Sequence, residues 1–167
     1  MTFFVTSETH SGDLGGLEGP DVICQRLATE VDAGDYTWRA YLSAHGMPVV
    51  GAVVPDHARD RIGNGTWYNA KGVLIAASLA DLHGDIQRDS NSIYRETALT
   101  EKGQLVNGRV RPEGTNKIAE GSAMIGYHDR VSSWNTSWNS SHATNGCSLE
   151  LFNETGGAGR FYCFAED

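Results

Sequence analysis

The sequence is most informative near its C-terminus, where it reads Gly156-Gly157-Ala158-Gly159-Arg160-Phe161-Tyr162-Cys163-Phe164. Successive side chains of a β-strand point to opposite faces, so an extended segment divides its residues into two alternating sets. One face would carry Phe161, Cys163 and Ala165, and the other would carry Tyr162 and Phe164. We therefore expect the chain to end in a strand over Arg160–Phe164.

The beginning of the chain predicts a strand, a loop and then a helix. Phe3–Thr6 is aromatic and β-branched, which favours a strand, and the glycine-rich loop 11–19 follows it. Pro20 suits the first position of a helix, and Gly34 is a typical residue just beyond the end of one. The expected helix carries Cys24 on the same face as an apolar series at helical spacing, namely Ile23, Leu27 and Val31.

Further strands and one short helix complete the expected secondary structure. The strands are Tyr36–Ser43, Ala123–Tyr127 and Cys147–Phe152. In the first of these, one face carries Trp38, Ala40 and Leu42, and the other carries Arg39 and Tyr41. Ser78-Leu79-Ala80-Asp81 has the pattern of a helix cap, which predicts a short helix through His83. Gly84–Glu120 is polar and turn-prone, and its length indicates either a functional loop or short elements.

Composition limits the class of protein. The 167 residues suit one domain, and the 20 glycines exceed the usual share of about 7%, which argues against a helix bundle. The net charge of -8 disfavours binding to nucleic acid or to anionic membranes. No apolar run approaches the roughly 18 residues of a membrane span, so no membrane insertion is expected. We expect a single α+β domain over residues 1–167.

Several segments resemble a known family, the bacterial lectin-like proteins of the C-type-lectin-like, or endostatin-like, fold. They are the opening Thr6–Gln25 with Thr37–Ser43, the middle stretch from Ala58 to Gly72, and the closing Gly156–Phe164. The resemblance implies an α+β fold with a mixed antiparallel sheet, two helices and long irregular loops. It also implies that the N- and C-terminal strands pair and that the loops carry the ligand contacts.

The three cysteines are Cys24, Cys147 and Cys163, which allow at most one internal disulfide. They match no zinc-binding spacing. The family resemblance implies a Cys24–Cys163 bridge, and Cys147–Cys163 is the competing pair. Either bridge implies a secreted, periplasmic or cell-surface protein, because disulfides persist in oxidising compartments. The first residues lack the pattern of a signal peptide, so export would require one that is absent from this sequence.

The expected ligand is a carbohydrate or glycan. Sugar-binding C-type lectins have a Trp-Asn-Asp triplet before their last strands, and this chain offers Trp134-Asn135-Thr136 and Trp138-Asn139-Ser140. Indole rings stack on sugars, and amides match paired hydroxyls. The expected ligand-binding residues are Asp129, Arg130, Asn135, Trp138, Asn139 and His142. The alternative interpretation makes Trp134 and Trp138 core residues.

These residues have different expected roles. Trp138 would stack on a sugar ring, and hydrogen bonds would come from Asp129, Asn135 and Asn139. Arg130 and His142 would orient the ligand or contact an anionic group on it.

Calcium is the candidate cofactor, although no cofactor is required by the sequence. Both triplets lack the Asp of the family, and the companion Glu-Pro-Asn triplet is absent, which disfavours calcium-dependent sugar binding. His128, Asp129 and His142 are weaker candidates for a transition-metal site. The alternative is that these two histidines make hydrogen bonds within loops.

Catalysis is not expected. Cys147 and His142 could form a thiolate pair, but no Gly-x-Ser-x-Gly nucleophile motif is present. The second hypothesis is an adhesion or structural module that binds a cell-surface protein through the same loops. A metal-dependent hydrolase is a distant third.

Overall fold

The computed structural model describes residues 1–43, 56–84, 92–106, 109–110, 124–126, 137–139 and 142–166, and within them the chain is an α+β protein of short elements. The strands are β1 (Phe3–Val5), β2 (Trp38–Ala40), β3 (Trp67–Tyr68), β4 (Leu74–Ala76), β5 (Arg109–Val110), β6 (Met124–Ile125), β7 (His142–Ala143), β8 (Gly157–Arg160) and β9 (Tyr162–Ala165). The helices are α1 (Glu18–Thr29), α2 (Ala58–Arg61), α3 (Leu79–His83) and α4 (Leu149–Glu154).

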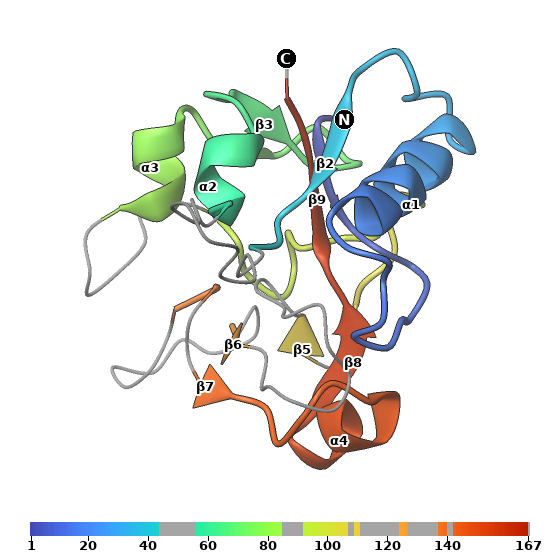
Figure 1. Ribbon diagram of the computed structural model, residues 1–167. Helices are drawn as coiled ribbons and strands as arrows, with labels where there is room; N and C mark the ends of the chain where they lie inside the picture. Colours follow the sequence, from blue (N-terminus) through green and yellow to red (C-terminus); the bar gives the residue numbers. More distant parts are fainter. Residues whose placement is uncertain are drawn as a thin grey trace, which may run out of the picture.

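The central sheet has the last strand in its middle. β9 pairs antiparallel with β1 on one side and with β2 on the other, so that Phe4 and Ala40 both lie opposite Cys163. Just before β1, the carbonyl of Thr2 accepts the backbone N–H of Ala165, the last residue of β9, at 2.9 Å. The expected pairing of the first and last strands is confirmed, and the two ends of the chain lie close together (Figure 1).

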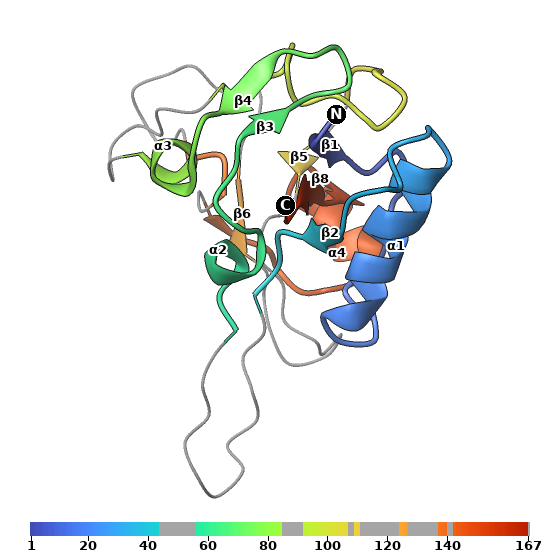
Figure 2. The same cartoon turned by 90° about the horizontal axis from the view of Figure 1, so that it is seen from above.

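Both faces of β9 are buried, in two separate apolar clusters. Phe161 and Cys163 lie in the cluster beneath α1, whereas Tyr162 and Phe164 lie in the larger cluster on the opposite face. The predicted alternation of side chains is therefore confirmed. Figure 2 shows α1 on one side of the sheet and α2 and α3 on the other.

A disulfide joins α1 to β9. Cys24 and Leu27 are fully buried on the inner face of the helix, and Cys24 is bridged to Cys163 with a Cα–Cα distance of 5.6 Å. This pairing confirms the bridge implied by the family resemblance and excludes the competing Cys147–Cys163 pair. The helix begins at Glu18, two residues before Pro20, and the N–H of Asp21 donates to the carbonyl of Leu17 at 3.4 Å across its first turn.

Side chains occupy the outer backbone edge of β2. The Asp21 carboxylate accepts the N–H of Ala40 at 2.9 Å and hydrogen bonds from Arg61 at 2.6 Å and Arg39 at 3.1 Å. Arg61 also donates to the carbonyls of Ala40 at 2.9 Å and Leu42 at 3.2 Å. An exposed strand edge can pair with another chain, so this Asp21 clamp satisfies backbone groups that would invite such pairing.

Replacing Asp21 with alanine is expected to lower the free energy of unfolding by about 2–3 kcal/mol. The change leaves the Ala40 N–H and the largely buried Arg61 guanidinium without their carboxylate partner. Removing one partner of a buried pair is costly, because the other partner stays buried and unsatisfied. Urea denaturation measures the effect. Glu18→Ala is the matched control, because Glu18 is an exposed carboxylate in the same helical turn. Equal losses in the two variants would contradict the structural role of the clamp.

The strand expected over Cys147–Phe152 is wrong, because most of this segment is the helix α4. Ser148 caps the helix by accepting the N–H of Leu151 at 3.2 Å. Leu149 and Phe152 are three residues apart and pack together with Cys147 in a small cluster. Apolar residues at that spacing share a helix face, although Cys147, Leu149 and Leu151 also alternate with polar residues as they would in a strand.

The structure also tests the expected helix cap at Ser78, the number of helices and the strand expected over Ala123–Tyr127. The cap at Ser78 is confirmed, since its hydroxyl accepts the N–H of Asp81 at 3.1 Å at the start of α3. The expectation of two helices is wrong, because α2 and α4 are present in addition to α1 and α3. β6 lies inside the expected strand Ala123–Tyr127. About half of Gly84–Glu120 lies outside the described residues, and the described part includes β5 and an isolated bridge between Leu99 and Leu105.

Candidate ligand-binding site

The structure describes only some of the residues expected to contact a ligand or a metal. Those outside the described residues are His128, Asp129, Arg130 and Asn135. His142 begins β7 and lies opposite Ile125 of β6. Trp138 and Asn139 are described with their side chains. That all of the expected ligand-binding residues lie close together therefore stays a prediction.

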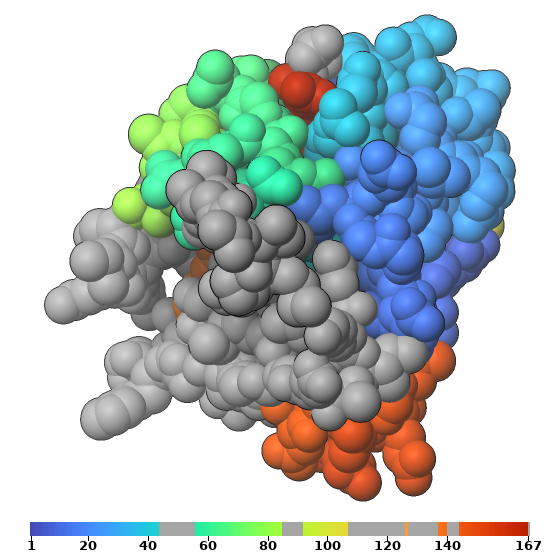
Figure 3. Space-filling model, viewed as in Figure 1, coloured from blue at the N-terminus to red at the C-terminus, as the bar shows by residue number. Residues whose placement is uncertain are grey.

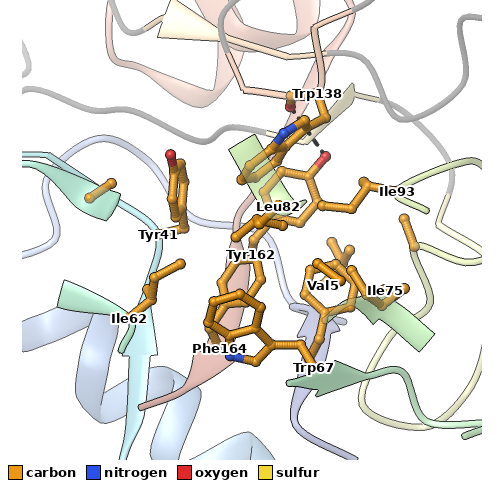
Figure 4. Packing of buried hydrophobic residues seen from close by; sticks show 14 of the residues in the cluster. Val5, Tyr41, Ile62, Trp67, Ile75, Leu82, Ile93, Trp138, Tyr162 and Phe164 are labelled. Atoms are coloured by element: carbon orange, nitrogen blue, oxygen red, sulfur yellow. Dashed lines mark hydrogen bonds between the residues drawn. The ribbon is translucent and has the colours of Figure 1, made fainter. Parts of the chain in front are cut away.

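Trp138 is a core residue. Its side chain is 1% exposed and packs against the rings of Tyr41 at 4.8 Å, Tyr162 at 5.3 Å and Phe164 at 6.2 Å between centroids. Figure 4 shows the indole beside Tyr41 and Tyr162, within the larger apolar cluster. A sugar needs an exposed ring face for stacking, and this position offers none. The expectation that Trp138 stacks on a sugar ring is therefore corrected, and the alternative, that Trp138 is a core residue, is the one that the structure supports.

Asn139 takes part in a hydrogen-bonded chain, here called the Tyr41 network. Its side-chain nitrogen donates to the Tyr41 hydroxyl at 3.1 Å, and that hydroxyl is 2.8 Å from Nε2 of His83. Nδ1 of the same imidazole is 2.8 Å from the carbonyl of Leu79. The network thus joins the residue after β2, the last residue of α3 and the residue after Trp138.

Which group donates in each hydrogen bond of the network follows from the Leu79 carbonyl at one end of it. A backbone carbonyl can only accept, so Nδ1 of His83 carries the proton that bonds to Leu79. In a neutral imidazole the other nitrogen then accepts, which makes the Tyr41 hydroxyl the donor to Nε2. The oxygen of that hydroxyl accepts in turn from the amide nitrogen of Asn139.

Partial burial favours the neutral form of His83. Desolvation lowers the pKa of this imidazole below its ordinary value, because a charged ring is less well solvated there. The Leu79 carbonyl opposes the shift, Arg59 adds to it, and Asp60 opposes it more weakly. The structure therefore supports the neutral tautomer on which the direction of the network depends.

A local turn holds the other end of the Asn139 amide. The amide oxygen accepts from the hydroxyl of Ser137 at 2.8 Å, and that hydroxyl accepts the backbone N–H of Asn139 at 3.4 Å. Asn139 is partly exposed, whereas the neighbouring Trp138 is buried. Trp138 is thus anchored in the core, and Asn139 is left partly exposed with its amide held by Tyr41 and Ser137.

Sequence reasoning missed Tyr41 and His83 as members of this site. Tyr41 was placed correctly on the face of β2 opposite Trp38, and His83 at the end of the capped helix. The link between them is a contact across 42 residues of sequence. The spacing of residues carries no signal for such a contact.

A second polar cluster secures the end of β1. The peptide between Thr6 and Ser7 is held from both sides, because Arg160 donates to its carbonyl at 2.6 Å and its N–H donates to Glu101 at 3.0 Å. The Glu101 side chain is fully buried, with the ammonium of Lys102 3.8 Å from its other oxygen. These contacts fix the chain where it leaves the central sheet, which is a structural role.

The metal-site hypothesis gains no support from the described part of the chain. Among these residues, no group of three or more His, Cys, Asp or Glu side chains is arranged to hold a metal ion. None of the helices seen there is long and apolar enough to cross a bilayer. Cys147 lies buried against Phe152, away from solvent.

The described residues thus form a small α+β protein with one disulfide and a partly exposed Asn139 whose amide is hydrogen-bonded to Tyr41. No protein-family model and no curated protein matches the sequence.

Proposed function

We propose that this chain is an exported, C-type-lectin-like binding domain that recognises a carbohydrate. The Cys24–Cys163 bridge is the observation that carries the proposal, because it ties the early helix to the last strand as the family resemblance implies. The pairing of β1 with β9 supports the same fold. A structural disulfide also supports an oxidising compartment, hence secretion, the periplasm or the cell surface.

The proposed binding surface is centred on Asn139. Its amide is oriented by Tyr41 and Ser137, and an oriented amide suits the paired hydroxyls of a sugar, which both donate and accept. Further proposed contacts come from Asp129, Arg130, Asn135 and His142. Trp138 contributes by anchoring the segment in the core, in place of the stacking role first expected.

A glycan array tests this proposal, run once with added calcium and once with a chelator. Binding to a defined set of sugars supports carbohydrate recognition, and its loss on chelation would assign calcium as a cofactor. An array that stays silent in both conditions would contradict the proposal. If this chain binds no sugar but captures a cell-surface protein, that result would favour the adhesion module.

Asn139→Ala is expected to weaken binding of the best array sugar about tenfold, the equivalent of one lost hydrogen bond. Isothermal titration measures the affinity, and circular dichroism confirms that the variant is folded. Asn153→Ala is the matched control, because Asn153 is exposed on α4. In the space-filling view α4 (orange) and the α2–α3 region (green) form separate parts of the surface (Figure 3). Unchanged affinity in Asn139→Ala would remove this residue from the site.

A further inference from the structure

Three asparagines of this chain are followed directly by glycine. The pairs Asn64-Gly65 and Asn145-Gly146 belong to the described residues, and Asn107-Gly108 lies outside them. Such pairs are the most prone to spontaneous loss of the asparagine amide, because glycine has no side chain to shield its backbone nitrogen. Both described asparagines are exposed, so the surroundings of the two glycines decide how reactive each pair is.

The fold requires a glycine at position 65. Its φ is +86°, which residues with a side chain rarely adopt, and an added Cβ would lie 3.0 Å from ring atoms of Trp67. Trp67 is 1% exposed, and its indole N–H donates to the carbonyl of Ala165 at 2.9 Å. The packing of the turn on this buried ring therefore places a glycine directly after an exposed asparagine.

The reacting groups of Asn64-Gly65 are accessible. Both residues are exposed, and no hydrogen bond within the described part of the chain engages the Asn64 side chain or the N–H of Gly65. The carbonyl of Asn64 accepts the N–H of Leu79, the first residue of α3, at 3.0 Å. The turn is thus attached to α3 through this carbonyl, while the asparagine amide and the next nitrogen stay exposed.

The pair Asn145-Gly146 is held more firmly. Gly146 is buried, and an added Cβ would lie 2.5 Å from Cδ1 of Leu151 on α4. The hydroxyl of Thr144 donates to the Gly146 carbonyl at 2.7 Å. The Gly146 nitrogen can reach the Asn145 side chain only after this packed segment opens, and local opening costs free energy. The peptide after Asn145 therefore protects an asparagine that is itself exposed.

We infer that Asn64 is a site of spontaneous deamidation in the folded protein, and that its isoaspartate product loosens the start of α3. The Gly65 nitrogen attacks the side-chain carbonyl carbon of Asn64 and forms a C–N bond. The side-chain nitrogen leaves as ammonia, which carries away the proton of the Gly65 N–H. Water then adds to either carbonyl of the resulting succinimide and opens the ring, which gives aspartate or isoaspartate.

Isoaspartate changes the backbone as well as the charge. The main chain then runs through the former side chain of residue 64 and is longer by a methylene group, and the original carbonyl becomes a free carboxylate. That carbonyl is the acceptor for Leu79, and the lengthened turn must also fit against Trp67. Ordinary aspartate at position 64 adds the same charge and keeps the peptide bond in place. Loosening of α3 therefore distinguishes the two products.

Peptide mapping by mass spectrometry tests the site. The folded protein is incubated in mildly alkaline buffer below its unfolding temperature, and the loss of each amide is followed with fragmentation that distinguishes isoaspartate from aspartate. Asn64 should convert at least about tenfold faster than Asn145, because only Asn145 requires local opening. In urea the two rates should agree within about twofold, since neither pair is then protected. Equal rates in the folded protein, or an Asn64 that stays intact while the chain in urea converts, would overturn the inference.

Hydrogen exchange at the Leu79 amide tests the consequence for α3. The isoaspartate form is separated from the unmodified protein by ion exchange, and Asn64→Asp is the matched control with the same charge and an ordinary backbone. The Leu79 N–H should exchange at least about tenfold faster in the isoaspartate form, and Asn64→Asp should stay close to the wild type. Equal exchange in all three proteins would contradict the loosening of α3. An equally fast exchange in Asn64→Asp would assign the effect to charge and contradict it as well.

Discussion

Replacing both bridged cysteines, as Cys24→Ala with Cys163→Ala, is expected to lower the free energy of unfolding by about 4–5 kcal/mol. The bridge spans 139 residues of sequence, so its removal restores a large amount of chain entropy to the unfolded state. Both sulfur positions are fully buried between α1 and β9, which adds lost packing. Urea denaturation of the double variant and the wild type gives the difference.

Cys147→Ala is the matched control for this experiment. Cys147 is equally buried but lies outside the bridge, so the substitution removes packing and leaves the covalent link in place. Its loss should be about 1–2 kcal/mol, in the range of a small core deletion. A double variant no less stable than this control would show that the bridge contributes little to the fold.

Trp138→Ala is expected to destabilise the protein by about 3–5 kcal/mol, the usual cost of deleting a buried aromatic side chain. The indole fills the space between Tyr41, Tyr162 and Phe164, and no small movement of these rings can close the cavity. Thermal and chemical denaturation measure the loss. Because the next residue is Asn139, sugar binding should fall as a secondary effect.

Two further variants separate a core role from a stacking role for Trp138. Trp138→Phe keeps an aromatic ring in the cluster and should recover more than half of the lost stability. Tyr68→Ala removes an aromatic ring that is 42% exposed, so it should cost under about 1 kcal/mol. A Trp138→Ala protein of wild-type stability that has lost sugar binding would restore the stacking hypothesis and contradict the core assignment.

The sequence predicted best those elements that depend on local pattern. Alternation placed Tyr162 and Cys163 on opposite faces of the last strand, and the helix of Cys24 was visible from its apolar spacing. The helix α4 was missed, because a short apolar run such as Cys147–Phe152 fits a strand as well as a helix and only the Ser148 cap separates them.

The candidate site was predictable only in part. Asn139 was proposed from its Trp-Asn pattern, and its role in ligand binding stays a prediction; the same pattern did not decide that Trp138 lies in the core. The burial of Trp138 depends on its packing with Tyr41, which in turn packs on Phe164. These contacts between distant segments are set by the fold. The partnership of Tyr41 with His83 is of the same kind and could not be inferred from spacing.

Peptide mapping under non-reducing conditions tests the central claim most directly, on protein purified from an oxidising compartment. The account predicts one linked pair of peptides, carrying Cys24 and Cys163, with Cys147 recovered as a thiol. A link between Cys147 and Cys163, or three reduced cysteines, would contradict both the closed architecture and the proposal of export.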